Sequence, residues 1–444
     1  MIELHLRGTD VETAYVCEII FSHWQQWKLS IHTTDQNHLS IGIVGKPAEK
    51  LVFGSVSALE TSEIVALITK IFTPNAVSRL RADCQERIID VHGVTNWLDK
   101  GALAVIFWLL SGQSESTCSV RDNHGRVSAA HMLLVEHKVL DLPIVDLLAE
   151  YLIDRIRSLQ PDLPIPSNNY QIIPTHDVDA PFKYAFCKPF NFLRSVVTDA
   201  ISGVSLRELA QAPTKWLKVR SGNIDLDPFN CFSEILDINE SYGLQSEFYF
   251  IAGHSGGRID GDYDIENPIM FSLLKEVVDR GHLIGLHSSY NAPFDATILN
   301  SERERLQKLA IEAKYFTPID IVRNHYLRFD PRITPNVLST CGFRQDSTLA
   351  FAEMVGFRRG TCRSFPLWDL ENKQPLSIIE RPLIAMECSL VSRRYENLSY
   401  VDAANRLDKL KAECRRFGGK MVVLWHNNYL RSAKDFELYE HAIR

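Results

Sequence analysis

The sequence predicts an α/β protein, in which a smaller mixed α/β domain precedes a larger domain built on a parallel sheet. From residue 171 onward, short apolar runs alternate regularly with helical patterns, and this alternation implies parallel strands with right-handed crossovers. A polar segment with three prolines, LQPDLPIPSNNY at 159–170, separates this region from a less regular one. We therefore expect a mixed domain at residues 1–160, and a barrel or a doubly wound sheet at residues 161–444.

The elements expected in the first region are short and of both kinds. Strand-like runs lie at 39–45 and 50–54, and helical patterns lie at 61–72, 102–110 and 144–159. The last helical pattern ends where proline prevents a further turn. These patterns predict a small α/β domain without fixing its topology, and they indicate no role for it.

The second region alternates more regularly. Strand-like runs lie at 171–178, 247–252, 283–287, 319–327 and 421–426. Helical patterns lie between them at 231–242, 269–280, 301–315 and 400–417. The segment 181–228 exceeds the roughly 15 residues of an ordinary connection, and we expect it to form a helical insertion over the mouth of the barrel. In both candidate architectures, ligands bind at the carboxyl ends of the strands.

Composition excludes several classes of protein. Hydrophobic residues make up 45% of the 444 residues and charged residues 23%, which is typical of a globular chain. The 55 acidic residues outnumber the 48 basic ones, which argues against a nucleic-acid partner. The most apolar run, at 102–110, is shorter than the roughly 20 residues that a membrane span needs. Scattered cysteines without a CxxC pair, and a start without a signal-peptide pattern, predict a cytoplasmic protein with reduced thiols. No obligate protein partner is indicated.

Carboxylate and imidazole side chains gather at the predicted strand ends. The first strand ends in Asp177 and, two residues on, Asp179, which point to the same face because side chains alternate along a strand. Histidines lie in the last part of three other strand-like runs: His287, His325 and His426. Aspartate and imidazole together suit zinc or another divalent ion, and a second carboxylate beside the metal can act as a general base.

Each of these residues also has an ordinary structural explanation. The aspartates could cap a helix or form ion pairs, and the histidines could be satisfied members of the core. Alternation turns His176 away from the two aspartates, so we expect it to lie in the core. The constellation is more specific than its parts, because its members follow separate strands of one domain.

These motifs, in this order, resemble those of the polysaccharide deacetylase family, a carbohydrate-esterase group, over about residues 172–426. The resemblance rests on Thr-His-Asp-Val-Asp at 175–179, Gly-Leu-His-Ser-Ser-Tyr-Asn at 285–291, Arg-Asn-His-Tyr-Leu-Arg-Phe at 323–329 and Leu-Trp-His-Asn at 424–427. The segments 104–126 and 345–360 also resemble a bacterial subgroup that has an uncharacterised N-terminal domain.

The resemblance implies a fold and an activity. The fold is an incomplete (β/α)7 deacetylase-like barrel. The activity is metal-dependent hydrolysis of carbon–nitrogen bonds other than peptide bonds, which removes an acetyl group, N-acetyl before O-acetyl, from a sugar unit. The implied substrate is a bacterial polysaccharide or its precursor, in the biosynthesis of cell-surface polysaccharide.

The resemblance also implies roles for the motif residues. Asp177 matches the catalytic base, and Asp179 and His287 match metal ligands. Where the family has a second metal-binding histidine, this chain has Asn291, so we expect His325 to be the third ligand of a divalent ion, with zinc foremost.

The remaining roles concern the acid, the arginine and the substrate. His426 matches the acid that protonates the leaving group. The family has an arginine that orients the base; Arg323, Arg328 and Arg358 are candidates, and Arg328 is the one predicted here. The residues predicted to contact a carbohydrate substrate are Tyr326, Asn291 and Trp425.

Two alternatives stay open. Because Asn291 replaces a ligand, the chain could instead be a catalytically silent, glycan-binding relative of the deacetylases. Stoichiometric metal would favour the hydrolase, and metal-free protein that binds sugar would favour the silent relative. Hydrolysis of a non-sugar amide is the other alternative, because a fold does not determine a substrate.

Overall fold

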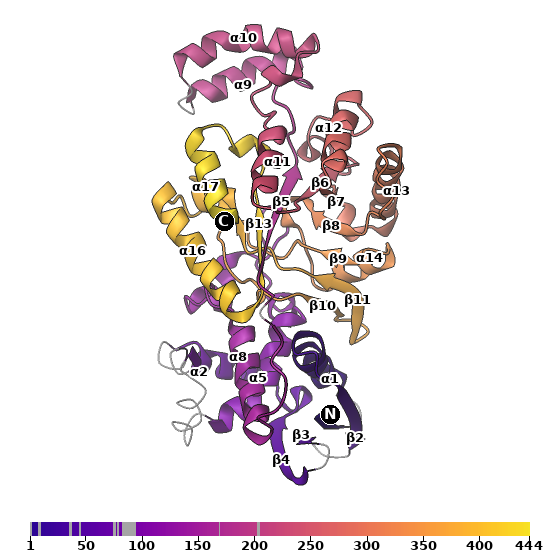
Figure 1. The fold of residues 1–444 in the computed structure, drawn as a ribbon, viewed down its shortest axis with the longest axis vertical. Coiled ribbons are helices and arrows are strands. Elements are labelled where there is room, and N and C mark those ends of the chain that lie inside the picture. The colour runs from indigo at the N-terminus through magenta and orange to yellow at the C-terminus, as the bar shows by residue number, and fades with distance from the viewer. Residues whose placement is uncertain are drawn as a thin grey trace. The chain divides into compact units, whose positions relative to one another are not determined.

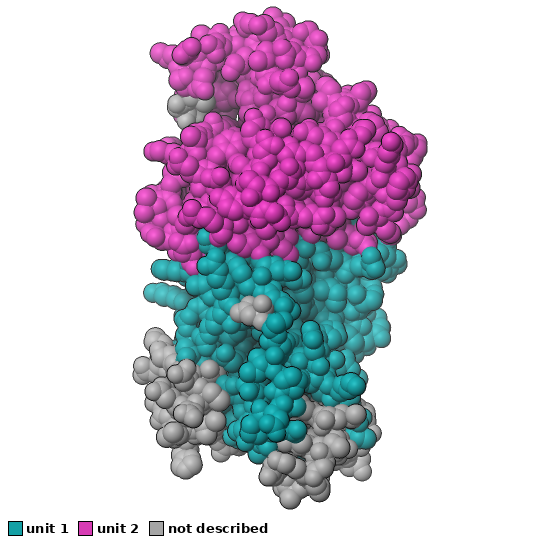
Figure 2. Space-filling view, in the orientation of Figure 1, with its two compact units in different colours: residues 1–171, 327–384, 409–421 teal, residues 172–326, 385–408, 422–444 magenta. Residues whose placement is uncertain are grey.

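The computed structural model describes residues 2–7, 10–34, 38–43, 46–73, 77, 80–81, 95–167, 169–201 and 205–444. The chain forms two compact units, coloured separately in Figure 2. The first unit comprises residues 1–171, 327–384 and 409–421, and the second comprises 172–326, 385–408 and 422–444. The first break follows the predicted linker, but the first unit also includes two later segments that the sequence analysis counted with the second domain.

The N-terminal part of the first unit combines a sheet with helices. Its strands are β1 (Ile2–Arg7), β2 (Leu29–Thr34), β3 (His38–Ile43) and β4 (Lys46–Gly54), in the order β2-β1-β3-β4. Its helices are α1 (Val11–Cys17), α2 (Thr61–Ile71), α5 (Thr95–Leu110), α6 (Gln113–Ser116), α7 (Leu133–Glu136) and α8 (Ile144–Leu159), with a π-helix at Glu18–Trp24. Strands β1 and β2 are parallel, whereas β3 pairs antiparallel with β1 and β4.

Helix α5 forms the centre of this unit. Every residue from 102 to 110 is buried. A helix that is apolar on all sides removes its side chains from water only by lying inside the core, and α5 contacts α1, α2 and α8. The apolar run that was too short for a membrane span is therefore a core helix. Among the helices that the structure describes, none combines the length and the apolar composition that crossing a bilayer requires.

The segment 327–384 of the first unit adds a helix and three strands. These are α14 (Thr334–Thr340), β9 (Gln345–Asp346), β10 (Phe365–Asp369) and β11 (Gln374–Glu380). Strand β10 pairs antiparallel with β11, and β11 pairs parallel with β9. The sequence analysis did not predict these three strands.

The second unit is built on a parallel sheet. Its strands are β5 (Gln171–Val178), β6 (Glu247–Ile251), β7 (Leu283–Ser288), β8 (Ile321–Asn324), β12 (Ala385–Met386) and β13 (Lys420–Leu424). They follow the order β8-β7-β6-β5-β13-β12. Strands β6 and β7 are mostly apolar, apart from Glu247, His287 and Ser288, and almost entirely buried, as parallel strands covered on both faces are. In the described part of the chain no strand pair closes this order into a ring, so the incomplete (β/α)7 barrel stays a prediction.

Helices cover the sheet of the second unit (Figure 1). They are α11 (Phe232–Ser241), α12 (Pro268–Asp279), α13 (Ala296–Glu312), α15 (Glu387–Val391), α17 (Ala433–Ile443) and α16 (Tyr400–Phe417), of which residues 409–417 are counted with the first unit. The second unit also contains α9 (Pro189–Ile201) and α10 (Leu206–Arg220), which do not cover the sheet. Helices α12 and α13 both contact β7. Helices α9 and α10 occupy the segment in which the sequence predicted a helical insertion.

Candidate metal and catalytic site

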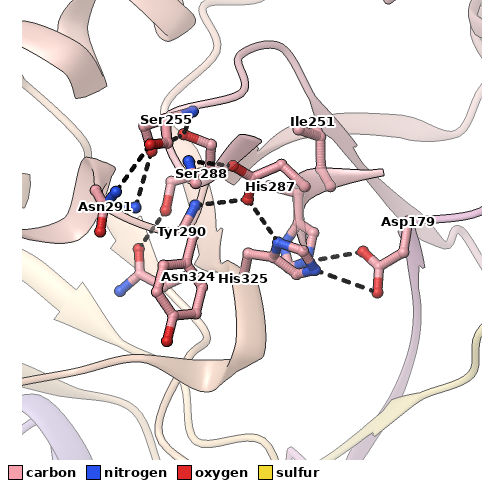
Figure 3. Close-up of polar contacts among 12 residues, drawn as sticks. Asp179, Ile251, Ser255, His287, Ser288, Tyr290, Asn291, Asn324 and His325 are labelled. Carbon is pink, nitrogen blue, oxygen red and sulfur yellow. Dashed lines mark hydrogen bonds and ion pairs between the residues drawn. The ribbon is translucent and has the colours of Figure 1, made fainter. Parts of the chain in front are cut away.

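Three predicted metal ligands converge beyond the ends of the strands (Figure 3). Asp179 directly follows β5, His287 lies on β7, and His325 begins the helical turn after β8. Each side chain offers one ligand atom, and the three atoms lie within 4.8 Å of one another. The chain therefore assembles one carboxylate and two imidazoles from three separate strands.

Hydrogen bonds orient both imidazole rings. The Nδ1 atom of His287 donates to the backbone carbonyl of Arg323 at 2.9 Å. The Nδ1 atom of His325 bonds to Oδ1 of Asp260 at 2.9 Å. Their Nε2 atoms lie 3.1 Å and 3.7 Å from the oxygens of Asp179. Metal-binding histidines usually use one ring nitrogen for the metal while the other donates to a carbonyl or a carboxylate, which is the arrangement seen at both rings.

Asp260 is the residue that fixes His325, and it was not predicted from the sequence. It is fully buried, and its Oδ1 also accepts from the backbone N–H of Tyr290 at 2.7 Å. Its Oδ2 accepts from the backbone N–H of Gly256 at 2.7 Å. Because it lies in a helical turn within a long loop after β6, no strand-end pattern in the sequence indicated it.

The residues present fit a divalent metal ion. With its Nδ1 proton on the Arg323 carbonyl, a neutral His287 ring presents the Nε2 lone pair to Oδ1 of Asp179. That oxygen is buried and accepts no hydrogen bond of normal geometry within the described chain, so a proton or a cation is needed between the two atoms. Burial alone raises the pKa of Asp179, but when the rings of His325 and His287 are protonated, their charges outweigh burial and hold this pKa well below its usual range. A bound cation would take the place of these protons. One carboxylate and two imidazoles form a donor set that zinc accepts with a position left open.

Asp177 is held beside this group by an arginine. Its Oδ1 accepts from Nη1 of Arg323 at 2.9 Å, and its Oδ2 lies 3.7 Å from Nε2 of His287. The guanidinium of Arg323 is fully buried, also donates to Oγ1 of Thr175 at 2.8 Å, and lies 4.6 Å from the centre of the Tyr249 ring. One carboxylate oxygen is thus fixed, and the other faces the metal-ligand group.

The arginine that contacts Asp177 is not the one predicted to orient the base. Arg328 donates from Nε to the carbonyl of His124, and Arg358 forms two hydrogen bonds with the carboxylate of Glu115, all within the first unit. Arg323 lies on β8 directly beside His287 of β7 in register, which brings it to Asp177. Arg323, one of the three arginines that the sequence left open, therefore replaces Arg328.

His426 contacts Asp179 from the end of β13, the strand on the other side of β5 from β6. It follows β13, which pairs with β12, and its Nε2 lies 3.5 Å from Oδ2 of Asp179. Its Nδ1 is 2.6 Å from Oε1 of Glu387, a buried residue directly after β12 that was missed in the sequence. Burial alone lowers the pKa of His426, but the carboxylates of Glu387 and Asp179 outweigh burial and hold this pKa well above its usual range.

The three predicted substrate residues differ in accessibility. Tyr326 is half-buried, has a left-handed backbone with φ 60°, and its ring centre lies 4.6 Å from that of His325. Asn291 is exposed and donates from Nδ2 to the carbonyl of Ser255 at 2.8 Å. Trp425 is only 2% exposed and packs on Tyr439, so a sugar has little of its ring to contact, and the role predicted for it does not fit.

His176 lies in the core, as predicted. Its Nδ1 donates to the carbonyl of Trp425 at 2.8 Å, and its ring stacks on Phe248. Burial lowers the pKa of His176 to about 3, which keeps the ring neutral. The alternation of side chains along β5 thus separates His176 from Asp177 and Asp179.

Comparisons with known proteins give matches to parts of the chain. Residues 3–161 match a family of unknown function (DUF7033). No curated protein matches the chain. Among solved structures, a Mycobacterium smegmatis protein assigned to the polysaccharide deacetylases is 14% identical, with a TM-score of 0.41, over 63% of this chain and 85% of that one. The family 4 carbohydrate esterase from Streptomyces lividans, solved in complex with acetate, is 13% identical, with a TM-score of 0.28, over 61% and 85%.

Puue allantoinase is a third similar structure. It is 9% identical, with a TM-score of 0.37, over 63% of this chain and 84% of that one. At these identities and TM-scores, nothing about function is drawn from the three structures. The functional proposal for this chain therefore rests on its own site residues.

Proposed function

We propose that this chain is a metal-dependent hydrolase that removes an acetyl group, N-acetyl before O-acetyl, from a sugar unit of a bacterial polysaccharide or its precursor. The observation that carries the proposal is the convergence of Asp179, His287 and His325, with a second carboxylate and a third imidazole in contact with them. We also propose that the parallel sheet of the second unit belongs to an incomplete (β/α)7 barrel. The cytoplasmic location predicted from the sequence stays a prediction.

Zinc is the ion proposed for this site. Asp179, His287 and His325 would hold it, since their three donor atoms lie within 4.8 Å of one another. When bound, such an ion polarises an acetyl carbonyl and lowers the pKa of a water molecule. The chain's own part is to fix both imidazole rings through Asp260 and the Arg323 carbonyl.

Asp177 and His426 divide the proton transfers in the proposed reaction. Oδ2 of Asp177 takes a proton from the attacking water, because Oδ1 is occupied by Arg323. The water oxygen adds to the acetyl carbon, and the carbon–nitrogen bond then breaks. Nε2 of His426 gives its proton to the departing nitrogen, because Nδ1 is occupied by Glu387. The products are acetate and a free amine. Glu387 acts as a positioning residue in this scheme.

Two residues are proposed to contact the sugar. Tyr326 presents part of its ring beside His325, and its left-handed backbone is a strained conformation that such sites often contain. Asn291 is exposed on the loop after β7.

Acetate release tests the proposal. The purified, zinc-loaded chain is incubated with N-acetylglucosamine oligomers and with O-acetylated glycans, and acetate is measured. We expect release from the N-acetylated substrates, and a loss of roughly 10²–10⁴-fold in kcat for Asp177→Asn with metal content unchanged. We expect His287→Ala to lose the metal as well. Asp264→Asn, which changes an exposed carboxylate paired with Arg305, is the matched control.

Three results would contradict the proposal. A loss of less than about tenfold for Asp177→Asn removes this residue as the base. Metal-free protein that still binds glycan supports the catalytically silent relative. Stoichiometric zinc without acetate release from any glycan, together with hydrolysis of a non-sugar amide, supports the other alternative.

A further inference from the structure

Helices α9 and α10 form a hairpin with a small core of its own. Its buried residues are Tyr184, Phe192, Ala212 and Val219, with Trp216 packed against them. The ring of Trp216 stacks on that of Phe192 at 4.9 Å between centres. Figure 1 shows the two helices side by side, standing out from the rest of the second unit. The packing of this core thus holds the two helices, and the side chains on their outer faces, in a defined arrangement.

Large apolar side chains form a stripe on the outside of this hairpin. Its members on α9 are Phe190, Leu193, Val197 and Ile201. Their spacing of three and four residues places them on one face of the helix. Leu206 and Leu217 are exposed in the same way on α10 and are counted here with the stripe; the exposed fractions of all six lie between 59% and 85%. None of the six is among the buried core residues, so the stripe is available for contact with something else.

Basic residues accompany the stripe. Residues 183–220 contain seven lysines and arginines against two acidic residues, in a chain whose net charge is −7. The two acidic side chains are used within the hairpin, since Asp199 pairs with Lys183 and Glu208 caps α10 at Ser205. The exposed basic residues are Lys188, Arg194, Arg207, Lys218 and Arg220. The hairpin is therefore a positive, partly apolar projection on a negative protein.

We propose that the α9–α10 hairpin binds the surface of an anionic lipid bilayer. Exposed apolar side chains on one helical face, with lysine and arginine around them, are what a helix needs to lie in the headgroup region. The helices have 13 and 15 residues and α10 contains Pro213, so they are suited to lying on a membrane and too short to cross it. The excess of positive charge favours anionic lipid as the partner. A second copy of this chain would bring a second positive hairpin against the first, and the like charges would repel each other. This inference does not depend on the proposed hydrolase activity.

Vesicle flotation of the full chain tests the proposal. The probes are vesicles of phosphatidylcholine alone and vesicles in which about one third of the lipid is phosphatidylglycerol. We expect binding to the anionic vesicles, weakening with added salt, and much weaker binding to the neutral ones. The double variant Leu193→Ser/Val197→Ser is expected to bind about tenfold less tightly or worse.

The controls separate the stripe and its charges from general surface effects. Phe190→Ser is expected to bind anionic vesicles more weakly than the unaltered chain. Phe316, outside the hairpin, is 77% exposed, close to the 79% of Phe190, so Phe316→Ser is its matched control and is expected to bind like the unaltered chain. Arg207→Gln/Lys218→Gln removes two exposed charges, and each removed charge is expected to lower the affinity for anionic vesicles about fivefold. The charge-matched control is Lys308→Gln/Lys434→Gln, which changes exposed lysines elsewhere in the unit.

Other outcomes would overturn the proposal. Equal binding to both kinds of vesicle would show that anionic lipid has no special role. An absence of binding to either kind would show that the hairpin does not bind membranes. If the Leu193→Ser/Val197→Ser variant instead dissociates an oligomer in the absence of vesicles, the stripe is an interface between two copies of this chain. If all variants and controls lose binding equally, the hairpin is not the site.

Discussion

Replacing Asp260 with asparagine tests whether a buried carboxylate supports the candidate metal site. Oδ1 of Asp260 lies 2.9 Å from Nδ1 of His325, and the residue also accepts from two backbone N–H groups. Asparagine has the same shape and one remaining acceptor, so Asp260→Asn removes the charge while leaving the ring of His325 room to stay in place. We expect zinc to bind more weakly to this variant.

The size of the effect follows from these contacts. Hydrogen bonds to a charged partner are roughly twice as strong as neutral ones, and loss of an outer-shell partner of a metal ligand typically costs about 10–100-fold in affinity. That range corresponds to about 1.4–2.8 kcal/mol. The amide nitrogen would also face the N–H of Gly256, which leaves a partly buried donor unpaired and lowers the free energy of unfolding by about 1 kcal/mol.

Zinc affinity is measured by competition with a chromophoric chelator at constant pH, and urea unfolding of the metal-free variant checks that it is folded. The tautomer of His325, read from its ring nitrogens by NMR, gives a second measurement that does not depend on metal. Asp264→Asn, in the same loop but exposed and paired with Arg305, is the control. An unchanged zinc affinity for Asp260→Asn, or an equal loss for the control, would refute the assigned role of Asp260.

Three further predictions follow from buried charges. Arg323→Met leaves the Asp177 carboxylate without its ion-pair partner and is expected to lower the free energy of unfolding by about 3–5 kcal/mol in urea titrations; in the double variant with Asp177→Asn the cost is expected to be smaller than the sum. Burial raises the pKa of Glu302 from 4.5 to about 7. The contribution of Glu302 to the free energy of unfolding is therefore highest below pH 4.5 and falls by about 3 kcal/mol as the pH rises to 7. Glu302→Gln is expected to flatten this part of a plot of Tm against pH. Glu387→Gln is expected to lower acetate release about tenfold or more without changing zinc content, and an unchanged rate would exclude Glu387 as the partner of His426.

Much of the fold was predictable where strong local patterns met a clear boundary. Helix α8 (144–159), strand β5 (171–178) and helix α16 (400–417) begin and end as predicted. Strand β8 is shorter than the predicted 319–327, because the backbone leaves the extended conformation at His325 and Tyr326 takes a positive φ. Strands β10 and β11 were missed; β11 has no regular alternation of buried and exposed positions from which period two could be recognised.

The candidate site was predictable to the extent that its residues follow strands. Asp177, Asp179 and His287 were found because the carboxyl ends of parallel strands share one edge of a sheet. Asp260 lies in a loop helix, and Glu387 follows a strand of only two residues, so neither carries such a signal.

The catalytically silent alternative was motivated by Asn291, which stands where the deacetylases that the motifs resemble have a histidine, and the geometry weakens that motive. A zinc site requires three donor atoms within reach of one ion, whatever their order in the sequence. His325 supplies an imidazole from the helical turn directly after β8, the strand next to that of His287, and its other ring nitrogen is held by Asp260. Asn291 meanwhile lies apart from Asp179 in Figure 3, and its amide nitrogen donates a hydrogen bond to the carbonyl of Ser255. The three donor atoms that the proposed site requires are thus available without Asn291, so this residue is no argument against the proposed hydrolase.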